Sequence, residues 1–222
     1  MIYITGDTHG ELKKLYYLNA SFEDIIIITG DFGFIWNDLP RNIYLLKKIA
    51  KYPFTVAFVD GNHENFRELL NYPEEQWNNG KIGRISSNVI HLKRGQVFTI
   101  EGKTIFTMGG GISIDKEHRI KDISWWKEEE LSARDIEEGF SNLDKVNWIV
   151  DYVITHELPN KIMQQVHSSF GEKIRVRKIL DEFDEKLSFK IWYSGHYHND
   201  VLLSKKYQIL YNKILLLGEI IS

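Results

Sequence analysis

Short apolar runs recur along the chain, and each is followed by a glycine or a polar turn, a pattern typical of buried strands. We predict strands at Met1–Thr5, Asp24–Thr29, Phe54–Val59, Val89–Leu92, Gln96–Ile100, Thr104–Met108, Tyr152–Thr155 and Lys190–Ser194. Apolar residues at helical spacing predict helices at Glu11–Asn19, Asp38–Lys51, Asn65–Asn71, Ser132–Leu143 and Lys173–Glu185. Further strand-like runs are Tyr207–Tyr211 and Ile214–Ile221.

The spacing of these elements changes along the chain, from strands alternating with helices to closely spaced strands. The runs within Val89–Met108 are separated only by the turns Arg94–Gly95 and Glu101–Lys103, which predicts consecutive antiparallel hairpins. The stretch Gly109–Lys127 is predicted to be a long loop. We expect an α/β (α+β) fold in which two mixed β-sheets pack as a sandwich with helices outside.

The 222 residues contain no internal repeat and no low-complexity linker, which favours one domain over residues 1–222. Hydrophobic residues make up 43% of the chain, enough for a full core. There is no cysteine, so a disulfide scaffold and a thiolate metal site are excluded. The formal net charge of -3 gives no argument for a nucleic-acid coat or an anionic membrane, while a local basic groove stays open.

The first residues, Met1–Asp7, have no basic leader, so we do not expect a signal peptide. The longest apolar runs, Ile25–Ile28 and Ile214–Leu217, are far shorter than the ~20 residues of a membrane span. We therefore expect a soluble cytoplasmic protein with no membrane partner and no obligate protein partner. The run Ile214–Ile221 pairs inside the fold or across a dimer; the first is favoured, because connected strands usually neighbour one another.

Five polar clusters lie directly after predicted strands. In chain order they are Gly6–Gly10, Gly30–Asp31, Gly61–Glu64, Thr155–His156 and Gly195–His198. In open α/β sheets, ligand sites form beyond the carboxyl ends of the strands, so we expect these loops to converge on one site. Glycine precedes the polar residue in four of the clusters, which suits a sharp turn and close approach of the backbone.

The residue types in these clusters are suited to binding metal. Asp, His and Asn side chains are hard-to-borderline ligands for Mn²⁺, Fe or Zn²⁺. Two such cations ~3.5–4 Å apart hold a phosphate and activate a water, and one carboxylate has to bridge them; Asp31 stands alone in its cluster. Asp7 and His9 alternate along an extended segment and should point to the same side, as should His196 and His198.

Each cluster alone also has a structural explanation. Gly6–Asp7 reads as an ordinary turn, Asn62–His63 as a helix cap, and a lone His156 as a structural histidine. Of the remaining histidines, His91 in an apolar strand is expected to be structural and His167 to be exposed. All five clusters together, in order and each at a strand end, favour the metal site.

The series resembles the calcineurin-like metallophosphoesterases, whose pattern reads Asp-x-His, Gly-Asp, Gly-Asn-His-Asp/Glu, His and Gly-His-x-His. The resemblance runs from Asp7 to His198. It implies a four-layer fold of two sheets flanked by helices. It also implies a hydrolase that cleaves phosphate esters with a water activated by two divalent cations, Mn²⁺ before Fe, Zn, Ni or Mg.

Carried over by position, the resemblance implies that one cation is bound by Asp7, His9, Asp31 and His198. It implies that the second is bound by Asp31, Asn62, His156 and His196, so that Asp31 bridges the two. His63 corresponds to the family's histidine that is not a ligand, contacts the phosphate and can protonate the leaving oxygen. The implied catalytic residues are therefore His63 and Asp31, and Asn62 is counted with His63 among the substrate contacts.

The segment after the second Gly-Asp departs from the family. Protein Ser/Thr phosphatases and dinucleotide hydrolases continue there with x-x-Asp-Arg-Gly, in which the Arg grips phosphate and the Asp orients the catalytic His. Here Phe34 and Ile35 occupy the Asp and Arg positions. Asp38 lies nearby and is equally explained as a helix N-cap, so no residue is assigned to orienting His63.

The stretch Gly109–Arg119 and the following Trp125–Glu129 resemble a subgroup of bacterial and phage phosphoesterases without assigned substrates. One interpretation is a substrate wall, in which Arg119 or Lys116 binds phosphate and a Trp stacks on a base. The other is a glycine turn, a solvated charge run and two core tryptophans. The two are balanced for Arg119, and at least one Trp is expected in the core.

The substrate prediction follows from the missing Arg. A phosphomonoester dianion profits from an added cation, whereas a diester needs apolar or aromatic surface, which we expect from Phe34, Trp36, Trp125 and Trp126. We expect a phosphodiesterase for a nucleotide or nucleic-acid end; the net charge of -3 favours a small nucleotide. The alternatives are a phosphomonoesterase or protein phosphatase, and a non-catalytic scaffold, which the full set of ligands and His63 disfavours.

Overall fold

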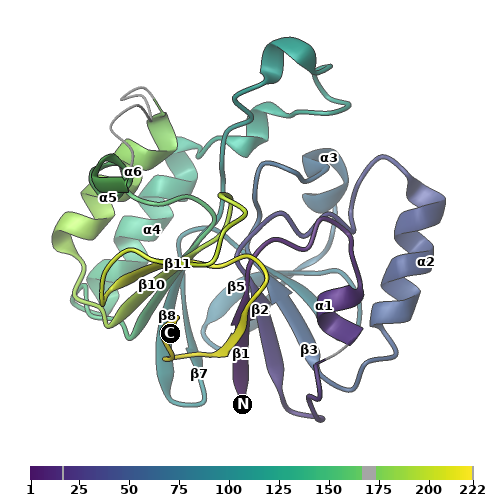
Figure 1. Cartoon of the computed structure of the whole chain (residues 1–222), viewed down its shortest axis with the longest axis horizontal. Coiled ribbons are helices and arrows are strands. Elements are labelled where there is room, and N and C mark those ends of the chain that lie inside the picture. Colours follow the sequence, from purple (N-terminus) through teal and green to yellow (C-terminus); the bar gives the residue numbers. More distant parts are fainter. Residues whose placement is uncertain (17, 167–173, 222) are drawn as a thin grey trace.

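The computed structural model describes residues 1–16, 18–166 and 174–221. Two β-sheets pack face to face, and helices cover the outer face of each (Figure 1). This architecture confirms the predicted fold class, an α/β sandwich of two mixed sheets with flanking helices. Three residues with predictions attached lie outside the described ranges: Tyr17 of the predicted helix Glu11–Asn19, His167, and Lys173 of the predicted helix Lys173–Glu185.

The first sheet has seven strands in the order β13-β1-β2-β3-β6-β5-β4. Its parallel centre consists of β1 (Ile2–Thr5), β2 (Ile25–Ile28), β3 (Thr55–Phe58) and β6 (Val89–Leu92). Antiparallel strands complete its two ends: β13 (Ile214–Leu216), β5 (Gly80–Arg84) and β4 (Glu74–Trp77).

The second sheet has six strands in the order β11-β12-β10-β9-β8-β7. Its parallel centre consists of β8 (Lys103–Met108), β9 (Tyr152–Thr155), β10 (Ile191–Ser194) and β12 (Tyr207–Ile209). Its antiparallel edges are β7 (Gln96–Ile100) and β11 (Val201–Leu202).

The buried isoleucines of β2 show how the layers are separated. Ile25 and Ile27 lie in the core between the sheets, whereas Ile26 and Ile28 pack beneath the helices. A parallel strand covered on both faces requires such a continuous apolar run.

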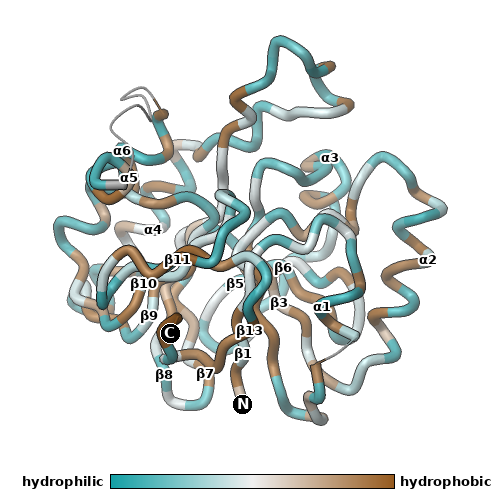
Figure 2. The backbone as a smooth tube through the Cα atoms, in the orientation of Figure 1, coloured by the Kyte–Doolittle hydropathy of each residue, from teal (hydrophilic) through white to brown (hydrophobic). Residues whose placement is uncertain are grey.

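The helices on the first sheet are α1 (Lys13–Tyr16), α2 (Leu39–Ile49) and α3 (Phe66–Leu69). Those on the second are α4 (Ala133–Lys145), α5 (Asn160–Val166) and α6 (Arg175–Lys186). Figure 2 shows hydrophobic residues recurring along the strands.

The predicted caps occur where the sequence places them. Ser132 and Asp135 form a capping box at the start of α4, with Ser132 N donating to Asp135 Oδ2 over 2.8 Å. Asp38 caps α2 and accepts from Arg41 N at 3.0 Å. Of the predicted helix Glu11–Asn19, the described residues form the helix α1 over Lys13–Tyr16.

The predicted hairpin between Val89–Leu92 and Gln96–Ile100 is wrong. β6 pairs in the first sheet and β7 in the second, so the chain changes sheets at Arg94–Gly95. Leu92 and Phe98 belong to the core between the sheets and therefore meet face to face rather than edge to edge. Gly95 adopts φ 69, a left-handed conformation that glycine reaches without strain, and allows this change of direction.

The sequence pattern did not reveal the hairpin of β4 and β5. Its strand β4 is polar and mostly exposed, so it lacks the apolar alternation of a half-buried strand. The turn residues Asn78 and Asn79 have φ 48 and 72, as a two-residue hairpin turn requires.

The remaining elements complete the sandwich. The run Ile214–Ile221 pairs inside the fold, as favoured, through β13 against β1. The predicted loop Gly109–Lys127 contains short 3₁₀ turns and an isolated bridge between Lys121 and Trp125, and it projects from the body, in teal at the top of Figure 1. Within the described ranges, no helix is both long enough and apolar enough to cross a membrane.

Candidate metal centre

The candidate site lies where the carboxyl ends of parallel strands from both sheets meet. The loops carry Asp7 and His9 after β1, Asp31 after β2, Asn62 and His63 after β3, His156 after β9, and His196 and His198 after β10. Because the strands within each sheet are parallel neighbours, their loops leave at the same edge. The contacts described below bring the five loops together.

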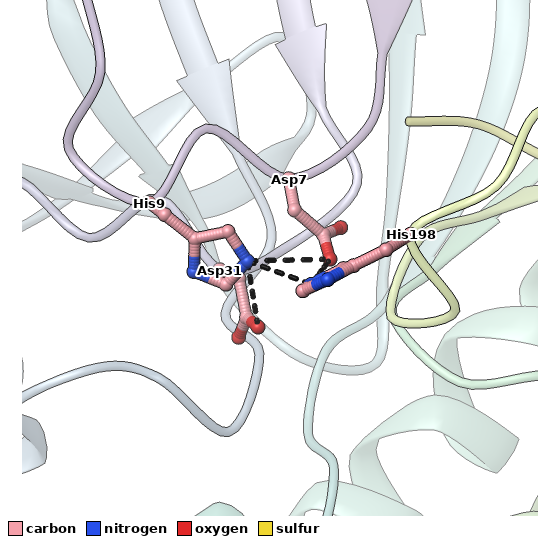
Figure 3. A group of neighbouring side chains, drawn as sticks. All are labelled: Asp7, His9, Asp31 and His198. Atoms are coloured by element: carbon pink, nitrogen blue, oxygen red, sulfur yellow. Dashed lines mark hydrogen bonds and ion pairs between the residues drawn. The ribbon is translucent and has the colours of Figure 1, made fainter. Parts of the chain in front are cut away.

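The first group of side chains consists of Asp7, His9, Asp31 and His198, drawn in Figure 3. Their candidate ligand atoms all lie within 4.8 Å of one another. His9 Nε2 is 3.8 Å from Asp7 Oδ2 and from Asp31 Oδ2, and His198 Nε2 is 3.3 Å from Asp7 Oδ2. Two carboxylates and two imidazoles at this separation can hold a metal ion.

A second group forms around His156. Its Nε2 lies 3.3 Å from Asp31 Oδ1, 3.2 Å from Asn62 Oδ1 and 3.1 Å from His196 Nδ1. Asp31 therefore belongs to both groups, with Oδ2 towards His9 and Oδ1 towards His156. A carboxylate shared in this way is the arrangement that a bridging ligand requires.

Hydrogen bonds outside the site determine which nitrogen of each ring faces inwards. His156 Nδ1 donates to Thr29 O at 2.9 Å, so its Nε2 lone pair is directed at Asp31 and Asn62. His196 Nε2 lies 3.0 Å from Glu157 Oε1, which leaves Nδ1 for the second group. Such outer partners fix the tautomer and orientation of histidines that bind metals.

The backbone at several of these residues is strained. Asp31 and His9 have φ 47, His198 has φ 48 and His196 has φ 70, all in the left-handed region. Conformations of this kind cost about 1–3 kcal/mol each and persist where surrounding contacts impose them. Four of the seven candidate ligands adopt such a conformation.

A glycine allows the loop after β10 to lie against Asp7. A Cβ at Gly195 would meet Asp7 Oδ1 at 2.1 Å, which excludes any larger residue there. The close approach lets His196 N donate to both Asp7 oxygens over 3.1 Å. Similarly, His63 N donates to Asp31 Oδ1 over 2.8 Å. Backbone N–H groups thus stabilise both buried carboxylates.

The electrostatics of the first group favour an ionised Asp31 and a neutral His9, whereas the hydrogen bond with Asp7 raises the pKa of His198. Burial alone raises the pKa of Asp31, but the positive charge available on His156 and His63 outweighs it and leaves the pKa below its ordinary value. Burial lowers the pKa of His9 against the pull of Asp31 and Asp7. Both residues are therefore in the forms that bind cations.

Glu157 is a residue of the candidate site that the sequence interpretation missed. It is fully buried and holds His196, while Arg177 Nε at 2.8 Å and Tyr197 Oη at 2.6 Å hold its other oxygen. Burial raises the pKa of Glu157, but His196 and Arg177 outweigh this and lower it. Burial lowers the pKa of His196, but Glu157 outweighs this and raises it to about 9. A cation held at Nδ1 would therefore replace a proton.

His63 lies beside the first group. Its ring centroid is 5.4 Å from that of His9 and 6.1 Å from that of Trp36. Arg119, from the projecting loop, places Nη2 3.3 Å from His63 Nε2. Burial lowers the pKa of His63, and the charge of Arg119 lowers it further despite the opposing effect of Asp31. The His63 ring thus lies next to the first group and in contact with Arg119.

Two of the aromatic residues expected to face the substrate do not do so. Phe34 is 0% exposed and Trp126 is 2% exposed, because both pack in the core beneath α1, α2 and α3. Trp36 and Trp125 are half-buried and remain accessible. The expectation that at least one Trp lies in the core is confirmed, and His91 is buried and bonded to Asp60 at 2.8 Å, as expected of a structural histidine.

The comparisons with known proteins agree with this geometry. The family model of the calcineurin-like phosphoesterases matches residues 1–200. The chain therefore belongs to the calcineurin-like phosphoesterase family, whose members are metal-dependent and act on phosphate esters. The comparison with curated proteins found no match.

The shared carboxylate can be tested by metal binding. Asp31→Asn removes the charge that faces both groups, so we expect the affinity for at least one Mn²⁺ to fall by more than about 100-fold, beyond the 10–100-fold typical of losing an outer partner. Calorimetric titration and metal analysis measure this. Asp38→Asn, the same change at the cap of α2, is the control and should bind as wild type. Two ions held by Asp31→Asn with wild-type affinity would contradict the shared role.

Proposed function

We propose that this chain is a phosphodiesterase that uses two divalent cations to hydrolyse a nucleotide-type phosphate ester. The observation that supports it most is the position of Asp31, whose two oxygens face separate sets of donors. We propose Mn²⁺ as the first choice of metal. Fe, Zn, Ni and Mg are alternatives, because carboxylate, imidazole and amide donors do not select sharply among these ions.

In this proposal the two groups each hold one cation. The first comprises Asp7, His9, Asp31 and His198, and the second Asp31, Asn62, His156 and His196. The residues fit this role, since His156 and His196 have their outer nitrogens engaged and their inner nitrogens turned to the donors of the second group. The chemistry that such a pair supplies is charge neutralisation on phosphate and a lower pKa for a bound water, from 15.7 towards about 7.

His63 is proposed to protonate the leaving oxygen. It is held between the ring of His9 and Arg119, at the rim of the first group, where an ester bound at the cations would extend. A general acid must come within hydrogen-bond reach of the atom that it protonates. Asn62 and Arg119 are the proposed phosphate contacts beside it, since Asn62 adjoins His63 and Arg119 touches its ring.

The preference for a diester follows from the charges around His63. Phe34 and Ile35, at the positions of the family's Asp-Arg pair, are buried in the core and present no charge to the site. Trp36 and Trp125 offer accessible aromatic surface for an organic substituent. Arg119 supplies a cation, but Asp115 is paired with it at 2.8 Å and offsets its charge. A singly charged diester suits this balance better than a dianionic monoester.

A phosphomonoesterase is the second candidate, and the position of Arg119 favours it. A guanidinium 3.3 Å from His63 is close to where the Arg of protein phosphatases is expected to act. A non-catalytic scaffold is disfavoured by the complete set of donors. The two activities differ in the charge of the substrate and can therefore be separated with matched esters.

Matched substrates test the reaction and the ester class together. We expect Mn²⁺-loaded protein to cleave bis-p-nitrophenyl phosphate with a kcat/KM about tenfold or more above that for p-nitrophenyl phosphate, equivalent to about 1.4 kcal/mol of transition-state stabilisation. Cyclic nucleotides, dinucleotides and single-stranded DNA follow as a screen. A clear preference for the monoester that Arg119→Ala abolishes would establish the second candidate. Well-folded protein without turnover under any of the five metals would contradict the enzymatic proposal.

His63→Gln separates acid catalysis from metal binding. Since His63 lies outside both donor groups, we expect the metal content to stay at two ions per chain while kcat falls by about 10²–10⁴-fold. The control is His118→Gln on the projecting loop, where the side chain is 80% exposed and should leave kcat unchanged. Loss of metal from His63→Gln would instead identify His63 as a ligand.

A further inference from the structure

The loop between β8 and α4, residues 109–131, is here named the insertion. Its root is fixed to the body by Arg94, which donates from Nη2 to Glu128 O at 2.8 Å and from Nη1 to Glu130 O at 3.1 Å. Glu129, buried in the root, accepts from Ser113 N at 2.9 Å and from Trp126 N at 3.0 Å. The projecting part of the insertion therefore starts from a firmly held base.

The insertion brings Arg119 to His63 and contacts its guanidinium through two of its own residues, Asp115 and Ser124. Arg119 Nε lies 2.8 Å from Asp115 Oδ1, and Nη1 donates to Ser124 O at 3.2 Å. Nη2 faces His63 Nε2 at 3.3 Å. Asp115 and Arg119 flank the 3₁₀ turn Lys116–His118, so their i,i+4 contact is local and needs no other part of the fold. The Arg119 side chain is 16% exposed, whereas that of Asp115 is 48% exposed.

The contact of Arg119 with His63 matters because the segment after Asp31 brings no charged side chain to His63. Ile35 and Phe34 are buried in the core below the site, so this segment supplies neither an arginine nor a carboxylate to His63. The Asp115–Arg119 pair reaches His63 from a different part of the chain. Because Asp115 binds Nε and Ser124 binds Nη1, the orientation of the Arg119 guanidinium is fixed. Further N–H groups on Nη1 and Nη2 can then donate to an oxyanion.

We propose that Asp115 is a positioning residue that holds Arg119 for phosphate binding beside His63. The inference rests on the proposed function, because the phosphate that Arg119 would bind is that of the ester hydrolysed at the candidate metal centre. An arginine restrained in its binding orientation loses less side-chain entropy when phosphate binds, so the restraint increases affinity although the carboxylate reduces the net charge. If Asp115 positions Arg119, removing its carboxylate should weaken phosphate binding. If Asp115 acts only through its negative charge, removing it should strengthen phosphate binding, so the two roles can be distinguished.

The test is a double-mutant cycle read by orthophosphate binding to the Mn²⁺-loaded protein, measured by calorimetry. Arg119→Ala should weaken binding about 10- to 100-fold, the range for hydrogen bonds to a charged partner. Asp115→Asn should weaken it about 2- to 5-fold, the range for a half-exposed ion pair. In the Arg119→Ala background, Asp115→Asn should have no further effect. Glu117→Gln, 80% exposed on the same turn, is the matched control and should bind as wild type.

Three results would overturn the proposal: tighter phosphate binding by Asp115→Asn, unchanged binding, or an equal loss with and without Arg119. Metal analysis of every variant should give the wild-type Mn²⁺ content, and a lower content in Asp115→Asn also counts against a role confined to Arg119. If the variants show the expected coupling in phosphate binding but the wild-type protein cleaves neither ester, the result contradicts the proposed function and supports this inference. Wild-type protein that cleaves esters but binds no orthophosphate contradicts the inference alone.

Discussion

Two buried carboxylates, those of Asp7 and Asp31, lie where the edges of the two sheets meet, and the rest of the site is arranged around their charge. Each residue is only 1% exposed. Burying an ion without partners costs several kcal/mol, so the contacts around these two are obligatory. Backbone N–H groups of His196 and His63 donate to them, and imidazoles gather on their other sides. The strained left-handed residues in these loops are a consequence of this convergence.

The sandwich makes the convergence possible because each sheet contributes parallel strands that end at the same edge. Residues that closely follow strands of both sheets then orient the candidate ligands. Thr29, at the end of β2, fixes the ring of His156 from the first sheet, whereas Glu157 fixes His196 from the second through a buried ion pair with Arg177. The donors of the second group are thus held by both halves of the fold, which couples the packing of the sheets to the geometry of the site.

The sequence allowed the fold class and the candidate ligands to be predicted because both follow from local patterns: buried apolar runs, and polar residues directly after them. The change from the first sheet to the second at Gly95 could not be predicted from the sequence, since a short turn is compatible with both a hairpin and a crossover between sheets. Phe34 and Trp126 were misplaced because aromatic residues serve the core and a binding surface alike. The contacts of Glu157 with His196, and of Arg119 with His63, join distant loops, and no spacing encodes them.

The central claim is that Asp31 joins two cation sites, and anomalous diffraction from crystals saturated with Mn²⁺ tests it most directly. The account predicts two anomalous peaks about 3.5–4 Å apart, one on each side of the Asp31 carboxylate. The first should lie among Asp7, His9 and His198, and the second among Asn62, His156 and His196. A single peak in the first group at saturating Mn²⁺, with His156 and His196 away from any metal, would contradict it.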